Sequence, residues 1–119
     1  MAVNSNAYST ARYLIAGSVM TVRDQTWFTL DDIDARAYLS NSLEPEVESL
    51  EAMDVCQKKF SPVEGRKYRL EDKYFPEFSK ARGYFNVEYN GNLKVVNQEL
   101  DENDLEILKK EIDVIELLS

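Results

Sequence analysis

The spacing of apolar residues predicts a helix near each end of the chain. Between Asn6 and Arg23, apolar positions recur every three or four residues, which is the period of one helix face. The members of this stripe are Ala7, Ala11, Leu14, Ile15, Val19 and Val22. Another helix is predicted over 101–118, where Asp101 is a good N-cap and the apolar stripe is wide. A stripe of that width predicts burial on the chain's own body, on a partner, or on both.

Between these two helices, a short strand at Trp27–Leu30 is predicted, followed by two shorter helices. Thr29 is suited to cap the first of them, and Asp32 stands at the third helical position, where its carboxylate can reach back to the cap. Ser40–Ser42 has the composition of the turn that follows, and Ser42 is suited to cap the next helix. The apolar face of the next helix consists of Val47, Leu50 and Met53.

The pattern then changes to that of strands, in two hairpins. The first joins Val55–Phe60 to Arg66–Leu70, and alternate residues of its second strand are apolar and basic. The second joins Tyr84–Tyr89 to Asn92–Val96 through Asn90-Gly91, a favoured pair for a type I′ turn.

The order of helix, strand, helix, helix and hairpin resembles a winged helix-turn-helix domain over about residues 9–72. In that family the third helix carries apolar residues at intervals of three, and the hairpin ends near Gly-Arg-x-Tyr-x-Leu. The residues that match are Val47, Leu50, Met53, Gly65, Arg66, Tyr68 and Leu70. The resemblance implies an α+β fold, with a winged-helix core and an additional C-terminal β-hairpin and helix.

These parts are expected to form a single domain, 1–119. After the winged-helix core, residues 73–98 are predicted to form an aromatic linker (Tyr74–Phe78) and the second hairpin, followed by the helix at 101–118. The second hairpin lies outside the family pattern, and we expect it to extend the first sheet or to form a small sheet of its own.

Charge is distributed unevenly along the chain. Among 119 residues, 14 are basic and 22 acidic, and the net charge of −8 argues against a protein that coats phosphate nonspecifically. The span from Lys58 to Arg82 has eight basic and four acidic residues and so carries +4. The rest of the chain therefore carries −12. A functional hypothesis has to explain a basic hairpin on an acidic body.

Few residues are suited to catalysis or metal binding. The sequence has no histidine, so Cys56 has no imidazole partner for nucleophilic catalysis, and the most common zinc ligand is missing. Asp31, Asp32 and Asp34 crowd the first turn of a predicted helix, where the helix dipole favours negative charge, and they lack the spacing of a calcium loop. We expect no enzymatic activity, no cofactor and no metal site.

The single cysteine also bears on location. One thiol excludes an intramolecular disulfide, and we expect a reducing, cytoplasmic environment. No apolar run approaches the roughly 20 residues that span a bilayer, and the N-terminus lacks the pattern of a signal peptide. We expect no association with a membrane.

The family resemblance implies a small DNA-binding regulator. In winged-helix proteins the third helix usually enters the major groove and the wing touches backbone or minor groove. The third helix here exposes carboxylates, which phosphate would repel, so the basic wing is expected to make the main contacts. The predicted nucleic-acid-binding residues are Lys58, Lys59, Arg66, Lys67 and Arg69.

An acidic protein-interaction module on the same fold is the alternative hypothesis. Such a module would bind a basic partner, as an antirepressor, a phage inhibitor of host defence or a DNA mimic does. Its predicted contacts are Glu46, Glu48 and Glu51 on the third helix and Leu105, Leu108, Ile112 and Ile115 on the last. The last helix could also support a homodimer. A weakly active enzyme or a metal site is the third hypothesis, and the lack of histidine places it last.

Overall fold

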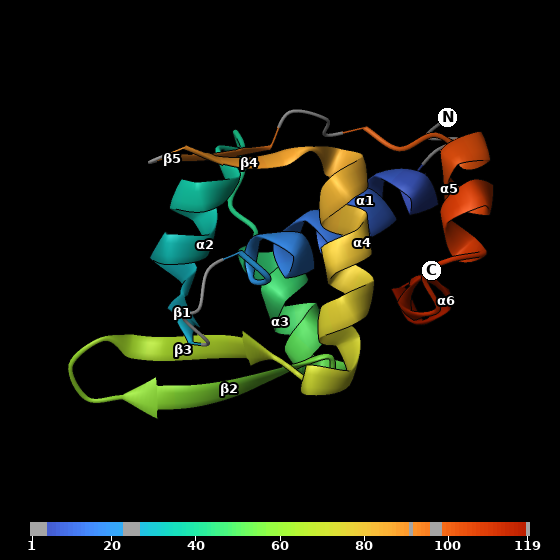
Figure 1. Ribbon diagram of the computed structural model, residues 1–119. Coiled ribbons are helices and arrows are strands. Elements are labelled where there is room, and N and C mark those ends of the chain that lie inside the picture. The colour runs from blue at the N-terminus through green and yellow to red at the C-terminus, as the bar shows by residue number, and fades with distance from the viewer. Residues whose placement is uncertain (1–4, 23–26, 91, 96–98, 119) are drawn as a thin grey trace.

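The computed structural model describes residues 5–22, 27–90, 92–95 and 99–118, which form a mixed helix and sheet fold (Figure 1). The elements are α1 (Ser5–Val19), β1 (Phe28–Thr29), α2 (Leu30–Ala37), α3 (Glu44–Ala52), β2 (Cys56–Ser61), β3 (Gly65–Leu70), η1 (Asp72–Tyr74), α4 (Phe75–Phe85), β4 (Val87–Asn90), β5 (Asn92–Val95), α5 (Glu102–Lys109) and α6 (Val114–Leu118). The expected α+β class is confirmed. No helix within the described ranges is long and apolar enough to cross a bilayer.

Helix α1 is the central element, and α2, α3, α4 and α6 all contact it. Its sequence suits this position because small and apolar residues surround most of the helix. The buried apolar side chains are Ala7, Ala11, Leu14, Ile15, Ala16 and Val19. The other helices are therefore placed by their packing on α1.

Two antiparallel sheets lie on different sides of this helical body (Figure 1). The larger sheet has the order β1-β3-β2, and Tyr68 at its centre pairs with Phe28 on one side and Lys58 on the other. Cys56, Tyr68 and Leu70 are buried, which anchors one end of the β2–β3 hairpin on the core. The smaller sheet contains only β4 and β5, and β5 contacts α2.

Two helix caps form as the sequence predicts. The Asp32 N–H donates to Thr29 Oγ1 over 3.1 Å while Asp32 Oδ2 accepts from the Thr29 N–H, which completes a capping box at α2. Asp101 caps α5 by accepting from the Asp104 N–H over 2.8 Å. At α3 the predicted cap residue Ser42 precedes the N-cap position, which Leu43 occupies.

The predicted aromatic linker is wrong, because Tyr74 belongs to η1 and Phe75–Phe85 is helix α4. Its buried residues Phe78, Ala81 and Phe85 have helical spacing, and Pro76 is tolerated in the first turn. The second hairpin consequently begins at Val87 rather than at Tyr84. It pairs Val87 with Val95, in a small sheet of its own, whereas Gly91 of the predicted turn lies outside the described residues.

The single helix expected over 101–118 is two helices, α5 and α6. The Val114 N–H at the start of α6 donates to Glu77 Oε1 of α4 over 2.5 Å. This carboxylate satisfies one of the amide groups that a helix start leaves without a helical partner. The break also lets Val114 and Ile115 enter the core together with Leu108 of α5.

Gly17 allows α4 to pack closely against α1. A Cβ atom at this position would overlap the ring of Phe78, which is fully buried. Next to Gly17, Ser18 Oγ donates to the carbonyl oxygen of Leu14 over 2.5 Å and to that of Phe78 over 3.3 Å. The glycine in α1 therefore serves helix packing and not chain flexibility.

We predict that Gly17→Ala destabilises the protein, by about 1–3 kcal/mol, because the added methyl group overpacks the α1–α4 contact. Gly83→Ala in α4 is the matched control, since a Cβ there meets nothing within 4 Å. Alanine is the better helix former, so the control should be neutral or more stable by up to about 1 kcal/mol. Urea unfolding measures both; equal stability of Gly17→Ala and wild type would contradict the close packing.

Candidate nucleic-acid and protein interaction surfaces

The β2–β3 hairpin presents two chemically different faces. Side chains alternate along each strand, and the register pairs Lys58 with Tyr68, Lys59 with Lys67, and Phe60 with Arg66. The inner face, which carries Lys58, Phe60, Arg66 and Tyr68, is on the side of α3. The outer face carries Lys59, Lys67 and Arg69. The sequence thus predicted five basic residues as one group, and the sheet divides them between two faces.

Cations of the inner face are paired with carboxylates of α3. Arg66 Nη1 lies 2.6 Å from Glu48 Oε1, and Arg66 Nη2 lies 3.5 Å from Glu44 Oε1. Lys58 Nζ lies 3.7 Å from Glu51 Oε1. These partly exposed pairs add little stability each. They do balance the charge of α3 and of the inner face within the chain.

Tyr68 connects the same helix to the core of the hairpin. Its hydroxyl group donates to Glu48 Oε1 over 2.8 Å, and its side chain is almost fully buried. Burial raises the pKa of Tyr68, and so does the hydrogen bond to the Glu48 carboxylate, which keeps the phenol as a donor; together they bring this pKa to about 12. Glu48 is therefore held by both Tyr68 and Arg66, on the inner face.

Two cations of the outer face lie near one indole ring, and a third lies across the sheet from one of them. Lys59 Nζ lies 4.3 Å from the centroid of the Trp27 ring, and Arg69 Cζ lies 5.7 Å from it. Lys67 stands directly opposite Lys59 in the sheet. The sequence analysis did not include Trp27 in the predicted site. Its position two residues before Thr29 could have placed it on the same face of the short strand as that residue.

The carboxylate partners of the outer face are local and exposed. Lys67 Nζ lies 3.0 Å from Glu64 Oε1, and Arg69 Nη2 lies 2.9 Å from Asp72 Oδ1, each three residues away along the chain. The Asp72 side chain is 93% exposed, so water screens this pair strongly. A phosphate group could replace such partners at small cost, whereas the inner-face partners are fixed on a helix.

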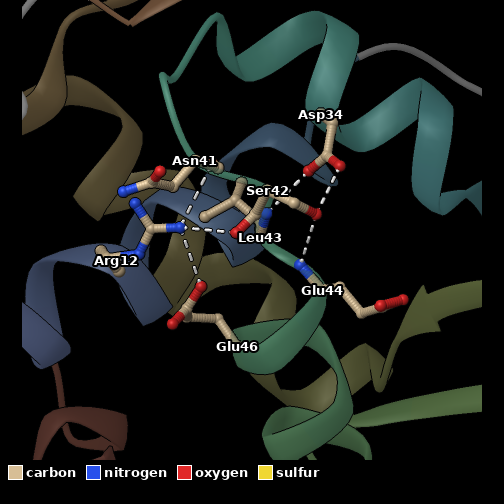
Figure 2. Close-up of polar contacts among 7 residues, drawn as sticks. All are labelled: Arg12, Asp34, Asn41, Ser42, Leu43, Glu44 and Glu46. Carbon is tan, nitrogen blue, oxygen red and sulfur yellow. Dashed lines mark hydrogen bonds and ion pairs between the residues drawn. The ribbon is translucent and has the colours of Figure 1, made fainter.

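The turn between α2 and α3 is held by a network of polar contacts (Figure 2). Arg12 Nη2 of α1 donates to the carbonyl oxygen of Ser42 over 2.8 Å and to Glu46 Oε1 over 3.0 Å. Asp34 of α2 accepts from Ser42 Oγ over 2.7 Å and from the Leu43 N–H over 2.8 Å. The position of α3 relative to α1 and α2 is therefore fixed by side chains from three helices.

This network changes the role expected for Glu46. Burial lowers the pKa of Arg12, but the hydrogen bond and charge of Glu46 outweigh it and leave this pKa above its ordinary value. The Glu46 side chain is 16% exposed and faces Arg12. It belongs to the structural network and is poorly placed to bind a partner.

The residues predicted for a partner surface on the last helix are also internal. Leu105, Leu108, Ile112 and Ile115 are all buried within the single chain. The stripe packs on its own body because the break between α5 and α6 turns both halves inward. The large apolar side chains that this part of the chain exposes are Ile107 and Leu117.

A pocket of about 450 Å³ lies beside the Arg12 network, between α1, the α2–α3 turn and the segment before α5. Its lining combines apolar side chains with Arg12, Ser40, Glu99 and Asp101. Arg12 already donates to the turn and to Glu46, and Asp101 caps α5. The main charged groups of the pocket thus serve the fold.

Cys56 has the environment of an inert thiol. It is buried, and its Sγ lies 3.8 Å from the carbonyl oxygen of Val47. Burial, followed by the negative charges of Glu51, Glu71 and Glu48, raises the pKa of Cys56 to about 12. Among the described residues, no group of three or more Cys, Asp or Glu side chains could hold a metal ion.

We predict that Cys56 of the folded protein reacts with a disulfide reagent at pH 8 at least about tenfold more slowly than the same thiol in denaturant. The reason is that the thiolate is the reactive species and is disfavoured at this buried position. Absorbance of the released thiol measures both rates. Equal rates would show that Cys56 is accessible and ionises normally.

No protein-family model, curated protein or solved structure matches the chain. A function for this chain therefore has to be inferred from the geometry and charge of its own surfaces.

Proposed function

We propose that this protein is a winged-helix DNA-binding regulator that contacts the duplex mainly through the outer face of its β2–β3 wing. The order of elements from α1 to β3 supports the winged-helix assignment, as does the strand order β1-β3-β2, in which the wing pairs with a short strand before α2. Fixing of the α2–α3 turn by Arg12 and Asp34 suits a helix-turn-helix unit.

The observation that carries this proposal is the group of three cations on the outer face of the wing, Lys59, Lys67 and Arg69. Lys59 and Lys67 face each other across the sheet, and the exposed Glu64 carboxylate, 3.0 Å from Lys67 Nζ, offsets only part of the repulsion between these like charges. A phosphate between them would relieve the repulsion. Arg69, whose partner Asp72 is highly exposed, can turn to a second phosphate. Contacts of this kind position a protein on DNA without reading its sequence.

Helix α3 has a different role from the third helix of most relatives of this fold. Its residues Glu44, Glu48 and Glu51 pair with the inner face of the wing, and bare carboxylates would repel phosphate. We infer that α3 supports the wing and makes few contacts with the major groove. Binding should then be weak in sequence preference and strongly dependent on salt.

We expect Lys59→Ala/Lys67→Ala to weaken duplex binding by about tenfold or more at about 50 mM salt and to reduce the slope of log K against log salt by about 2. Loss of two phosphate contacts is the cause. Lys109→Ala/Lys110→Ala on α5 is the matched control, with the same loss of charge at a distant site. Fluorescence anisotropy with a labelled random duplex measures both. The proposal is contradicted when folded wild type binds no duplex, or when both variants lose affinity equally.

An acidic protein-interaction module is the second candidate, and the surface of α5 and α6 favours it. Residues 99–118 contain eight acidic residues and two lysines. Ile107 of α5 and Leu117 of α6 are exposed among them, with 52% and 47% of their surface accessible. Apolar side chains within an acidic surface suit a basic partner that also has apolar contacts.

If this candidate is correct, immobilised wild type should capture a specific basic protein. Immobilised Glu102→Lys/Glu106→Lys/Glu116→Lys should fail to capture it, because three positive charges then repel the basic partner. All three side chains are exposed, so the fold should persist. Quantitative mass spectrometry of the captured material compares the variants, and Lys59→Ala/Lys67→Ala serves as the control that should retain the partner. Identical captured proteins for all three baits would remove the acidic surface as the contact.

A further inference from the structure

The tip of the β2–β3 hairpin exposes apolar side chains. Phe60 is 75% exposed and Val63 is 92% exposed, and Pro62 between them is exposed as well. Isolated exposed apolar residues are common on protein surfaces. Here they occur within four consecutive positions, on a turn that extends away from the helices (Figure 1). The tip is thus an apolar projection.

Hydrogen bonds from backbone N–H groups to the Ser61 side chain hold this tip in a defined conformation. Ser61 Oγ accepts hydrogen bonds from the N–H groups of Val63, over 3.3 Å, and Glu64, over 3.2 Å. Gly65 has φ 81, a left-handed conformation that favours glycine and returns the chain into β3. Ser61 pairs with Gly65 at the end of the ladder next to the turn, one position beyond the pair of Phe60 and Arg66. A preorganised tip loses little entropy when it inserts into a partner.

The charges behind the tip select the partner. Lys59 and Lys67 are next to the tip on the outer face of the hairpin, whereas Phe60 and Arg66 are on its inner face. Residues outside the span from Lys58 to Arg82 carry −12. An anionic partner is therefore repelled by the body and attracted only at the hairpin. Duplex DNA is narrow enough to meet a projecting hairpin without meeting the body, whereas an anionic membrane is a plane that approaches the acidic body too.

We propose that Phe60 and Val63 form a wedge that inserts at a base step of duplex DNA and partly unstacks it, while Lys59 and Lys67 contact the flanking phosphates. Apolar side chains that enter a base step from the minor groove act in this way, and they repay the unstacking cost by burying apolar surface. The wedge rests on the proposed DNA-binding function. It adds a specificity that phosphate contacts lack, a preference for base steps that unstack easily.

The test uses a duplex of about 30 base pairs with 2-aminopurine at a central TA step, a step that is easily deformed. Binding of wild type should raise the 2-aminopurine fluorescence, because unstacking removes its quenching. Phe60→Ser/Val63→Ser should abolish this rise and lower affinity about tenfold, with an unchanged salt slope since the lysines remain. Ile107→Ser/Leu117→Ser, the same loss of apolar surface on α5 and α6, is the matched control and should behave as wild type.

Each outcome separates the wedge from DNA binding itself. Wild type that binds the duplex in anisotropy without a change in 2-aminopurine fluorescence overturns the wedge and leaves the proposed function standing. The same holds when Phe60→Ser/Val63→Ser retains the fluorescence change. Absence of binding to any duplex overturns both. Sedimentation with vesicles of anionic phospholipid, if it depends on Phe60 and Val63 while duplex binding does not, assigns the tip to a membrane and overturns the wedge.

Discussion

Glu48 links the acidic helix α3 to the basic β2–β3 hairpin. One of its oxygen atoms accepts from both the Tyr68 hydroxyl and Arg66 Nη1, so a single carboxylate joins α3 to the hairpin. With Glu44 and Glu51 it brings the acidic helix and the inner-face cations into mutual neutralisation. Without these pairs, α3 would carry uncompensated negative charge beside a basic hairpin. The cations of the outer face pair instead with exposed carboxylates near them in the chain, Lys67 with Glu64 and Arg69 with Asp72.

The resemblance to winged-helix domains concerns the fold and not the surface that would contact DNA. Four residues that match the family pattern are buried: Val47, Leu50, Tyr68 and Leu70. These residues describe a core. The groups that would contact DNA do not follow from that core, since the identity of exposed residues on α3 is independent of its buried face. A helix with the right packing residues can therefore lack a surface suited to the major groove.

The sequence alone predicted the local features of the fold, and it failed where distant residues decide the structure. The capping box at Thr29 and the alternation of Tyr68 with Lys67 depend on neighbours in the chain, and both were predicted correctly. The break before α6 depends on Glu77, 37 residues from Val114. The role of Glu46 likewise depends on Arg12, 34 residues away. Helix α4 was missed for another reason, because aromatic residues around Pro76 suggested a linker despite the helical spacing of Phe78 and Ala81.

For the candidate site, the sequence identified the basic residues but did not show that they lie on two different faces of the hairpin. Alternation in β3 placed Lys67 and Arg69 together, yet only the pairing of β2 with β3 assigns Lys59 to them and Lys58 to α3. The basic hairpin and the acidic α5 and α6 also lie at different ends of the molecule (Figure 1). Residues so far apart, with no shared partners, contribute independently. The proposed DNA contact and the proposed contact of the acidic surface therefore depend on separate residues, and the two proposed functions are compatible in one chain.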